Sequence, residues 1–149
     1  MEIGGAEIEK VWIVDANVAT ALGRDLDSTW AGVVNGASAI REISRFPVGV
    51  YDARMAACIE GLDAPQDRSM VIALVGGLFA GMQPVPPDAA LITATTKMGI
   101  DNLEKLQKKR PARIPDILLS SLPELVSQKL GLSTTGDNVS ASCAPSTTA

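Results

Sequence analysis

Strand-like apolar runs alternate with helix-like segments along the chain, and this alternation constrains the fold more than any other feature of the sequence. The strand-like runs are residues 10–15, residues 89–95 and the run that begins at Asn138. The helix-like segments between them are residues 27–36, 71–81, 102–109 and 115–131. Strands joined by helices form parallel sheets in α/β folds. The sequence therefore predicts an α/β fold with a mostly parallel sheet, in the order strand, helix, strand, helix, strand, helix start.

Capping and breaking residues set limits to these helices. Asp27 or Ser28 can cap the first helix, and Gly36 closes it. Pro123 lies inside the last helix, so this helix either kinks or starts late. The apolar residues expected to face inward are Trp30, Val33 and Val34 in the first helix, and Ile117, Leu118, Leu122, Leu125, Val126 and Leu130 in the last. Residues 41–65 are expected to be irregular, with short strands.

The composition is that of one folded domain with an aliphatic core. The chain has 149 residues, of which 46% are hydrophobic and 20% charged, but only 3% are aromatic. The net charge of −4 argues against nonspecific binding to nucleic acid. The longest mid-chain run without charged or strongly polar residues, residues 70–82, is too short to span a bilayer. We therefore expect no nucleic-acid partner and no membrane partner.

The presence of two cysteines and the absence of histidine limit the chemistry that this chain can perform. Cys58 and Cys143 are too few for a disulfide framework or a metal site. Cys58 lies in the apolar run 55–59 and is interpreted as a packing residue. Glutamates precede the first basic residue, Lys10, which is unlike a signal peptide, so a reducing, cytoplasmic location is expected. The sequence has no histidine, so a mechanism that needs imidazole cannot be completed by this chain.

Cys143 is the candidate catalytic residue. Val139 and Ala141 alternate with serines before it, as in a strand with one packed face. Pro145 and Ser146 follow it and suit the first turn of a helix. A helix N-terminus carries free N–H groups and a partial positive charge, which favour a thiolate and stabilise an oxyanion. The alternative is a buried cysteine that packs as a small hydrophobic residue, which is the commoner role of this residue type.

The segment from Val139 to Ala149 resembles the active-site segment of the β-ketoacyl synthases, which are condensing enzymes of the thiolase-like superfamily. In that family, a cysteine flanked by small residues opens a buried helix. Cys143 and Ala144 fit this pattern. Pro145 departs from it, because the family usually has Ser or Gly at that position.

The N-terminal part of the chain carries the same resemblance. The family has a helix of the form Trp-x-x-Leu-x-x-Gly-x-Ser-x-Ile, preceded by Leu-Gly and followed by Arg-Phe. The matching residues here are Leu22-Gly23, Trp30, Val34, Gly36, Ser38, Ile40-Arg41 and Arg45-Phe46. The pair Asp67-Arg68 precedes the next helix, as in the family. The segment Asp15-Ala16-Asn17 and Ala21 depart from the pattern, where the family usually has Gly-x-Gly and Pro.

The resemblance implies a thiolase-like fold and a condensing enzyme of fatty-acid or polyketide synthesis. Residues 1–149 would be a single incomplete domain, the first part of the N-terminal half, ending just after the nucleophile. Cys143 would accept an acyl group, and a decarboxylative Claisen condensation would then give a 3-ketoacyl thioester. An acyl carrier protein would present the substrates on phosphopantetheine, and this chain would bind no cofactor and no metal.

In the family, histidines and a lysine from later segments complete the site. The chain alone is therefore expected to be inactive until a second polypeptide supplies the missing part. Family members form homodimers through the strand before the nucleophile, here residues 138–142, so a homodimer is expected.

Two other functions are compatible with the resemblance. One is a non-catalytic, condensing-enzyme-like partner subunit, although such subunits usually lack the cysteine. The other is a thiolase-type enzyme that acts on coenzyme A thioesters, although the pattern from Trp30 to Arg41 favours the synthase.

Basic residues cluster in the third helix-like segment and just after it, at Lys105, Lys108, Lys109, Arg110 and Arg113. They form either a docking patch for an acidic acyl carrier protein or a solvated helix end and loop. Asp101 and Glu104 lie in the same region and dilute the positive charge. We favour the solvated surface.

Overall fold

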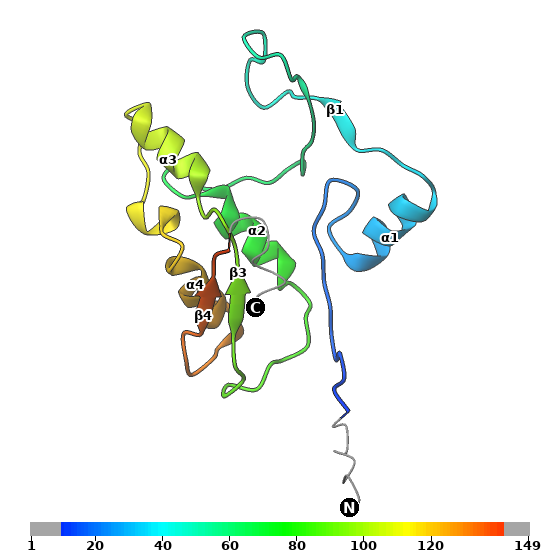
Figure 1. The fold of residues 1–149 in the computed structure, drawn as a ribbon, viewed down its shortest axis with the longest axis vertical. Coiled ribbons are helices and arrows are strands. Elements are labelled where there is room, and N and C mark those ends of the chain that lie inside the picture. Colours follow the sequence, from blue (N-terminus) through cyan, green and yellow to red (C-terminus); the bar gives the residue numbers. More distant parts are fainter. Residues whose placement is uncertain (1–9, 142–149) are drawn as a thin grey trace, which may run out of the picture.

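The computed structural model describes residues 10–141 and shows a mixed α/β chain with two small sheets (Figure 1). The helices are α1 (Leu26–Val34), α2 (Met70–Leu78), α3 (Ile100–Gln107), the 3₁₀ helix η1 (Ile114–Ile117) and α4 (Ser121–Leu130). The strands are β1 (Ile40–Glu42), β2 (Met55–Ala57), β3 (Ile92–Ala94) and β4 (Asp137–Val139). Each helix-like segment of the sequence thus contains a helix, and the second and third strand-like runs contain strands.

The pair β3 and β4 is parallel, as predicted. Ile92 lies opposite Asp137, and Ala94 lies opposite Val139. The Thr95 N–H extends the pairing by donating to the carbonyl oxygen of Val139 at 3.2 Å. Helix α4 packs against both strands, and α2 packs against α4. This part of the chain is therefore a helix-covered pair of parallel strands.

The last helix starts late, which resolves the alternative left open by its proline. Residues 118–120 separate η1 from α4. Pro123 lies in the first turn of α4, where a backbone N–H has no partner inside the helix. Gly131 ends α4 in the left-handed conformation with φ 69°, which glycine adopts without strain.

The region between α1 and α2 is mostly irregular and contains two short strands, as expected. Strand β1 pairs with β2 in antiparallel fashion, with Arg41 opposite Ala56. Figure 1 shows α1 and β1 set apart from the group formed by α2, α3, α4, β3 and β4. The two sheets are separate, one parallel and one antiparallel. The expected single, mostly parallel sheet is thus wrong for the described chain.

The strand predicted at residues 10–15 is not formed. The segment has no strand partner within residues 10–141. Its apolar side chains are almost fully exposed, at 91% for Val11, 78% for Trp12, 89% for Ile13 and 86% for Val14. A short apolar run predicts the extended conformation of a strand but does not specify the strand that pairs with it.

Two hydrogen bonds fix the end of this segment. The Gln83 N–H donates to Asp15 Oδ2 at 3.0 Å, and Asn17 Nδ2 donates to the carbonyl oxygen of Leu78 at 2.7 Å. The segment before Asp15 therefore projects from a fixed point at the end of α2.

The hydrophobic core of the described chain is small. Its buried apolar residues are Val75 in α2, Met98 after β3 and Val126 in α4. Helix α4 packs against β3 and β4, α2 packs against α4, and Met98 lies in the turn that follows β3. The core thus lies beside β3 and β4 rather than beside α1.

Several residues expected to face inward are exposed. Trp30, Val33 and Val34 are 65%, 54% and 65% exposed, and α1 buries none of its residues. Leu118 is 49% exposed because it lies in the break between η1 and α4. The prediction for these four residues is wrong, whereas Ile117, Leu122, Leu125 and Leu130 are half-buried and Val126 is buried. Helical periodicity identifies an apolar stripe but does not supply a surface that covers it.

Candidate functional site

The candidate nucleophile Cys143 lies outside the described residues, but the strand that leads to it is placed. The buried Thr93 hydroxyl lies within hydrogen-bond distance of two acceptors, the carbonyl oxygen of Asp137 at 3.1 Å and Asn138 Oδ1 at 2.9 Å, so β3 holds β4 by a side chain as well as by its backbone. Parallel strands end at the same edge of a sheet. The chain that continues from β4 therefore starts beside Thr95, at the carboxyl edge where α/β proteins bind ligands.

The turn after β3, residues 95–99, borders this edge and is firmly held. Thr95 Oγ1 donates to the carbonyl oxygen of Lys97 at 2.8 Å and lies 3.2 Å from the Lys97 N–H. The Gly99 N–H donates to the carbonyl oxygen of Asp116 at 2.9 Å. A Cβ at Gly99 would lie 2.3 Å from that oxygen and 2.8 Å from Ser69 Cβ, so a side chain does not fit. The turn can approach η1 this closely only because residue 99 is glycine.

A buried polar cluster lies behind the turn, where α2, α3 and η1 meet. We call it the Asp116 cluster, and its members are Arg68, Ser69, Asp101, Asn102, Lys105 and Asp116. Ser69 and Asn102 have no exposed surface, and Asp116 is 4% exposed. Asp116 Oδ2 accepts from Arg68 Nε at 2.8 Å and from the Ser69 N–H at 2.9 Å. One carboxylate thus joins η1 to the start of α2.

The other members join α3 to the same place. Asp101 accepts from the Ser69 hydroxyl and from the Met70 N–H. Lys105 Nζ donates to the carbonyl oxygen of Arg68 at 2.6 Å and to Asn102 Oδ1 at 2.9 Å. Throughout the described chain, every buried side-chain nitrogen and oxygen has a hydrogen-bond partner. The cluster therefore leaves no buried polar atom free for a ligand, and its role is structural.

The charge of Asp116 is stabilised by its neighbours. Burial of the carboxyl favours its neutral form and acts to raise its pKa. The hydrogen bonds from Arg68 and from the Ser69 N–H outweigh this effect, with help from the charges of Arg68 and Arg113, and the pKa of Asp116 lies below its ordinary value. Asp116 is thus a carboxylate at neutral pH, paired with Arg68 across a largely buried contact.

The Asp116 cluster was missed from the sequence because α3 reverses the usual pattern. Asn102 is buried and Lys105 is half-buried, whereas Ile100, Leu103 and Leu106 are 55%, 44% and 39% exposed. An amphipathic helix normally places its apolar stripe inward. The sequence carries one signal for this place, the pair Asp67-Arg68 just before α2, which also belongs to the family resemblance.

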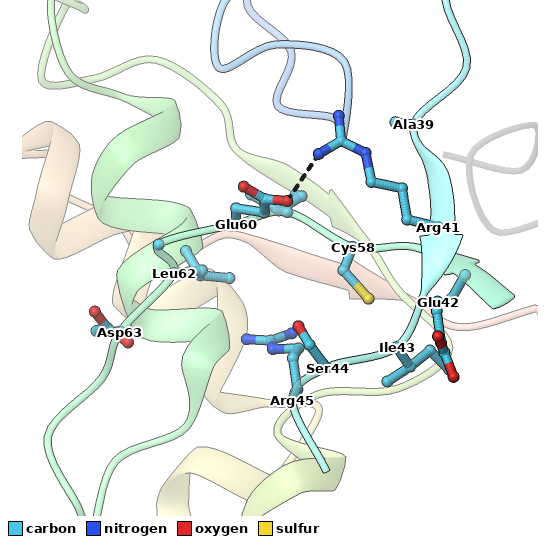
Figure 2. Close-up of a pocket in the computed structure, with 13 residues that line it drawn as sticks. Ala39, Arg41, Glu42, Ile43, Ser44, Arg45, Cys58, Glu60, Leu62 and Asp63 are labelled. Carbon is cyan, nitrogen blue, oxygen red and sulfur yellow. Dashed lines mark hydrogen bonds and ion pairs between the residues drawn. The ribbon is translucent and has the colours of Figure 1, made fainter. Parts of the chain in front are cut away.

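A cleft of about 390 Å³ lies between the β1–β2 ribbon and residues 58–63 (Figure 2). Arg41 Nη1 pairs with Glu60 Oε1 at 3.1 Å at its rim, and Arg24 donates to the carbonyl oxygen of Glu60. Figure 2 shows the Cys58 sulfur pointing into the cleft, with Arg45 on the other side of the space.

The apolar sequence neighbours of Cys58 indicated that it packs in an apolar setting. The structure does not enclose it in one. It is a free thiol, half-buried, and it shares the cleft with Arg41 and Arg45. The cleft is open and lined by charges of both signs, from Arg41 and Arg45 to Glu60 and Asp63.

Two of the clustered basic residues, Lys105 and Lys108, lie close to acidic residues of α3. Lys105 is held by the Asp116 cluster and lies 3.7 Å from Asp101. Lys108 forms an ion pair with Glu104 one turn away. Two of the five positive charges thus lie close to carboxylates of α3, and the preference for a solvated helix end over a docking patch stays a prediction.

Comparison with known proteins adds no family assignment. No family model matches the chain, and no curated protein matches it at a significant level. Residues 10–141 bring together no group of three or more histidine, cysteine, aspartate or glutamate side chains suited to a metal ion. None of the helices in that range combines the length and apolar character needed to cross a membrane.

Proposed function

We propose that this chain is the N-terminal part of a condensing enzyme of the β-ketoacyl synthase type, with Cys143 as its acyl-accepting nucleophile. The proposal takes the thiolase-like fold and the acyl carrier protein partner from the sequence resemblance. The observation that carries it is the position of the strand before Cys143, which runs parallel to β3 and leads to its carboxyl edge.

The surroundings of that edge support a nucleophile rather than a packing residue. The turn 95–99 borders the edge and is anchored by Gly99 and Asp116. Covalent catalysis needs a nucleophile held at a fixed place relative to its oxyanion donors. In this proposal, the turn 95–99 beside the end of β4 forms one wall of the site that holds the nucleophile.

The proposed chemistry has two steps, and both balance. The Cys143 thiolate attacks the carbonyl carbon of an acyl thioester, and the carrier thiol leaves, which gives an acyl-cysteine. A malonyl thioester then loses carbon dioxide, and its carbanion attacks the acyl-cysteine. This step forms a carbon–carbon bond, regenerates the Cys143 thiolate and gives a 3-ketoacyl thioester.

The imidazole groups that assist decarboxylation come, in this proposal, from a second polypeptide, because this chain contains no histidine. The chain on its own is expected not to complete the condensation. A complex of the two polypeptides, assembled further as a homodimer, would be the active form.

The experiment is a condensation assay on this chain together with the polypeptide that co-purifies with it from its source. An acyl and a malonyl thioester of acyl carrier protein are supplied, and the 3-ketoacyl product is measured by mass spectrometry. The wild-type complex should form product, Cys143→Ala should form none, and Cys58→Ala should remain active. A Cys143→Ala complex that forms product at the wild-type rate would refute the proposal.

A further inference from the structure

We propose that Lys97 binds an anionic group of the thioester substrate, which is either the phosphate of the phosphopantetheine arm or the carboxylate of the malonyl unit. The inference rests on the proposed function, because it assigns a substrate contact at the same carboxyl edge of β3 and β4. It adds a substrate-binding residue from the described chain to the nucleophile expected from the sequence.

Lys97 lies at the carboxyl edge, beside the chain that leads to Cys143. The Thr95 N–H donates to the carbonyl oxygen of Val139 at 3.2 Å, which joins the end of β3 to the end of β4. Figure 1 shows the arrows of these two strands pointing the same way. Lys97 follows Thr95 by two residues, and Cys143 follows Val139 by four, which span at most about 14 Å when fully extended. The lysine and the nucleophile therefore follow neighbouring strand ends at one edge of the sheet.

The backbone of Lys97 is held in place, and its side chain is exposed. Thr95 Oγ1 donates to the carbonyl oxygen of Lys97 at 2.8 Å and accepts from the Lys97 N–H at 3.2 Å. Two residues further on, the Gly99 N–H donates to the carbonyl oxygen of Asp116. The exposed lysine carries its charge on a flexible four-carbon stem. A fixed backbone with a long side chain in solvent suits a residue that contacts a ligand arriving at the edge.

Lys97 carries the only charge in the two chain segments that follow this edge. Residues 95–100 contain no other charged residue, and residues 138–149 contain none. Lys97 forms no ion pair within residues 10–141. Asp101, the acidic residue nearest to it along the chain, is bound instead within the Asp116 cluster. The positive charge of Lys97 is therefore available to an anionic ligand.

The substrates of the proposed reaction carry two groups of the matching charge. The phosphopantetheine arm carries a phosphate, and the malonyl unit carries a carboxylate. A lysine binds either group as a point charge with three N–H donors. A contact with the phosphate is remote from the reacting atoms, so it should lower the KM of a thioester without changing its rate at saturation.

The test compares thioesters that carry neither group, only the phosphate or only the carboxylate. They are acetyl-N-acetylcysteamine, acetyl-phosphopantetheine and malonyl-N-acetylcysteamine, supplied to the complex of this chain with its co-purifying polypeptide. For the two acetyl thioesters, mass spectrometry follows acetylation of Cys143. For the malonyl thioester it follows the 3-ketoacyl product, with acetyl-N-acetylcysteamine as the acyl donor. Lys97→Met should raise the KM of an anionic thioester about tenfold and leave that of the neutral thioester within about twofold.

The thioester that is affected identifies the anionic group. A raised KM for acetyl-phosphopantetheine assigns the phosphate, and a raised KM for malonyl-N-acetylcysteamine assigns the carboxylate. A merely structural role of Lys97 would affect the neutral thioester to the same extent. An equal effect on all three thioesters, or no effect on any, would overturn the inference.

Lys129→Met is the matched control for Lys97→Met. Lys129 is also exposed and forms no ion pair within residues 10–141. It lies in the last turn of α4, and the chain that leaves α4 enters β4 at Asp137, the end opposite the carboxyl edge. Lys129→Met should change no KM by more than about twofold, and Lys97→Arg, which keeps the charge, should retain most of the affinity. Equal losses in the two methionine variants would indicate an effect of net charge and would overturn the inference.

A measurement that needs no reaction separates the inference from the proposed function. Lysines are acetylated briefly with acetic anhydride, and mass spectrometry compares Lys97 with Lys129. Phosphopantetheine or malonyl-N-acetylcysteamine should slow modification of Lys97 about threefold or more, pantetheine should not, and Lys129 should react equally throughout. Protection of Lys97 in a protein whose Cys143 is never acetylated would uphold the anion site and refute the proposed function. Acetylation of Cys143 without protection of Lys97 by either anionic probe would overturn the inference and leave the proposed function standing.

Discussion

Gly99 should be sensitive to substitution, because its missing side chain allows the turn after β3 to contact η1. In Gly99→Ala, the new Cβ would lie 2.3 Å from the carbonyl oxygen of Asp116 and 2.8 Å from Ser69 Oγ. Residue 99 has φ −67°, which alanine adopts readily, so the cost is steric and not a backbone penalty. The closest atom belongs to the backbone and cannot rotate away.

Forced contacts of this kind destabilise a protein by about 1–3 kcal/mol. Gly77→Ala is the matched control, since a Cβ at Gly77 in α2 would meet nothing within 4 Å. The same substitution there should stabilise the helix by about 0.5–1 kcal/mol. The two alanine variants should therefore differ by roughly 1.5–4 kcal/mol, which corresponds to a difference in Tm of roughly 3–16 °C.

The assay is urea and thermal unfolding followed by circular dichroism, at one fixed protein concentration so that association affects each variant equally. Gly99→Ala should have the lower midpoint, and Gly77→Ala should match or exceed the wild-type protein. A Gly99→Ala protein as stable as Gly77→Ala would show that the turn does not contact η1 as described.

Two further predictions concern the Asp116 cluster. The pKa of Asp116 is lowered from 3.8 in the folded state, so its contribution to stability is complete above about pH 4 and is lost as the pH falls through the folded pKa. Urea midpoints should therefore fall more steeply in acid for the wild-type protein than for Asp116→Asn. Parallel curves for the two proteins would contradict the pairing of Asp116 with Arg68. Lys105→Met should lower the free energy of unfolding by roughly 1.5–3 kcal/mol, because it leaves buried acceptors without a donor. Lys108→Met removes an exposed ion pair and should lower it by about 0.5 kcal/mol or less. Equal urea midpoints for the two variants would show that Lys105 is solvated.

Some local features of the fold were predictable from the sequence, although the first helix is capped by Asp25 and not by Asp27 or Ser28 as expected. The partners of the elements were not predictable. Helix starts and ends depend on nearby residues, so Gly131 and Pro123 indicated correctly how the last helix ends and that it had to kink or start late. The apolar run at 10–15 was a reasonable strand by composition. Its partner is not encoded nearby, and the described chain leaves it unpaired.

One feature of the candidate site was predictable from the order of strands and helices: the direction of the strand that precedes Cys143. The alternation of elements indicated that the strand before Cys143 runs parallel to β3, and this is confirmed. The Asp116 cluster could not be predicted, because it joins residues distant in sequence, such as Arg68 and Asp116, and because α3 turns its polar side inward. Local periodicity carries no information about such long-range polar contacts.

The central claim is that Cys143 accepts an acyl group, and Cys58 provides an internal control in the same molecule. The complex of this chain with its co-purifying polypeptide is mixed with an acyl thioester of acyl carrier protein, quenched in acid and digested. Peptide masses then report acylation at each cysteine. The account predicts an acyl group on Cys143 that disappears when a malonyl thioester is added, with Cys58 unmodified throughout. Acylation of Cys58 to the same extent, or no acyl group on Cys143, would contradict it.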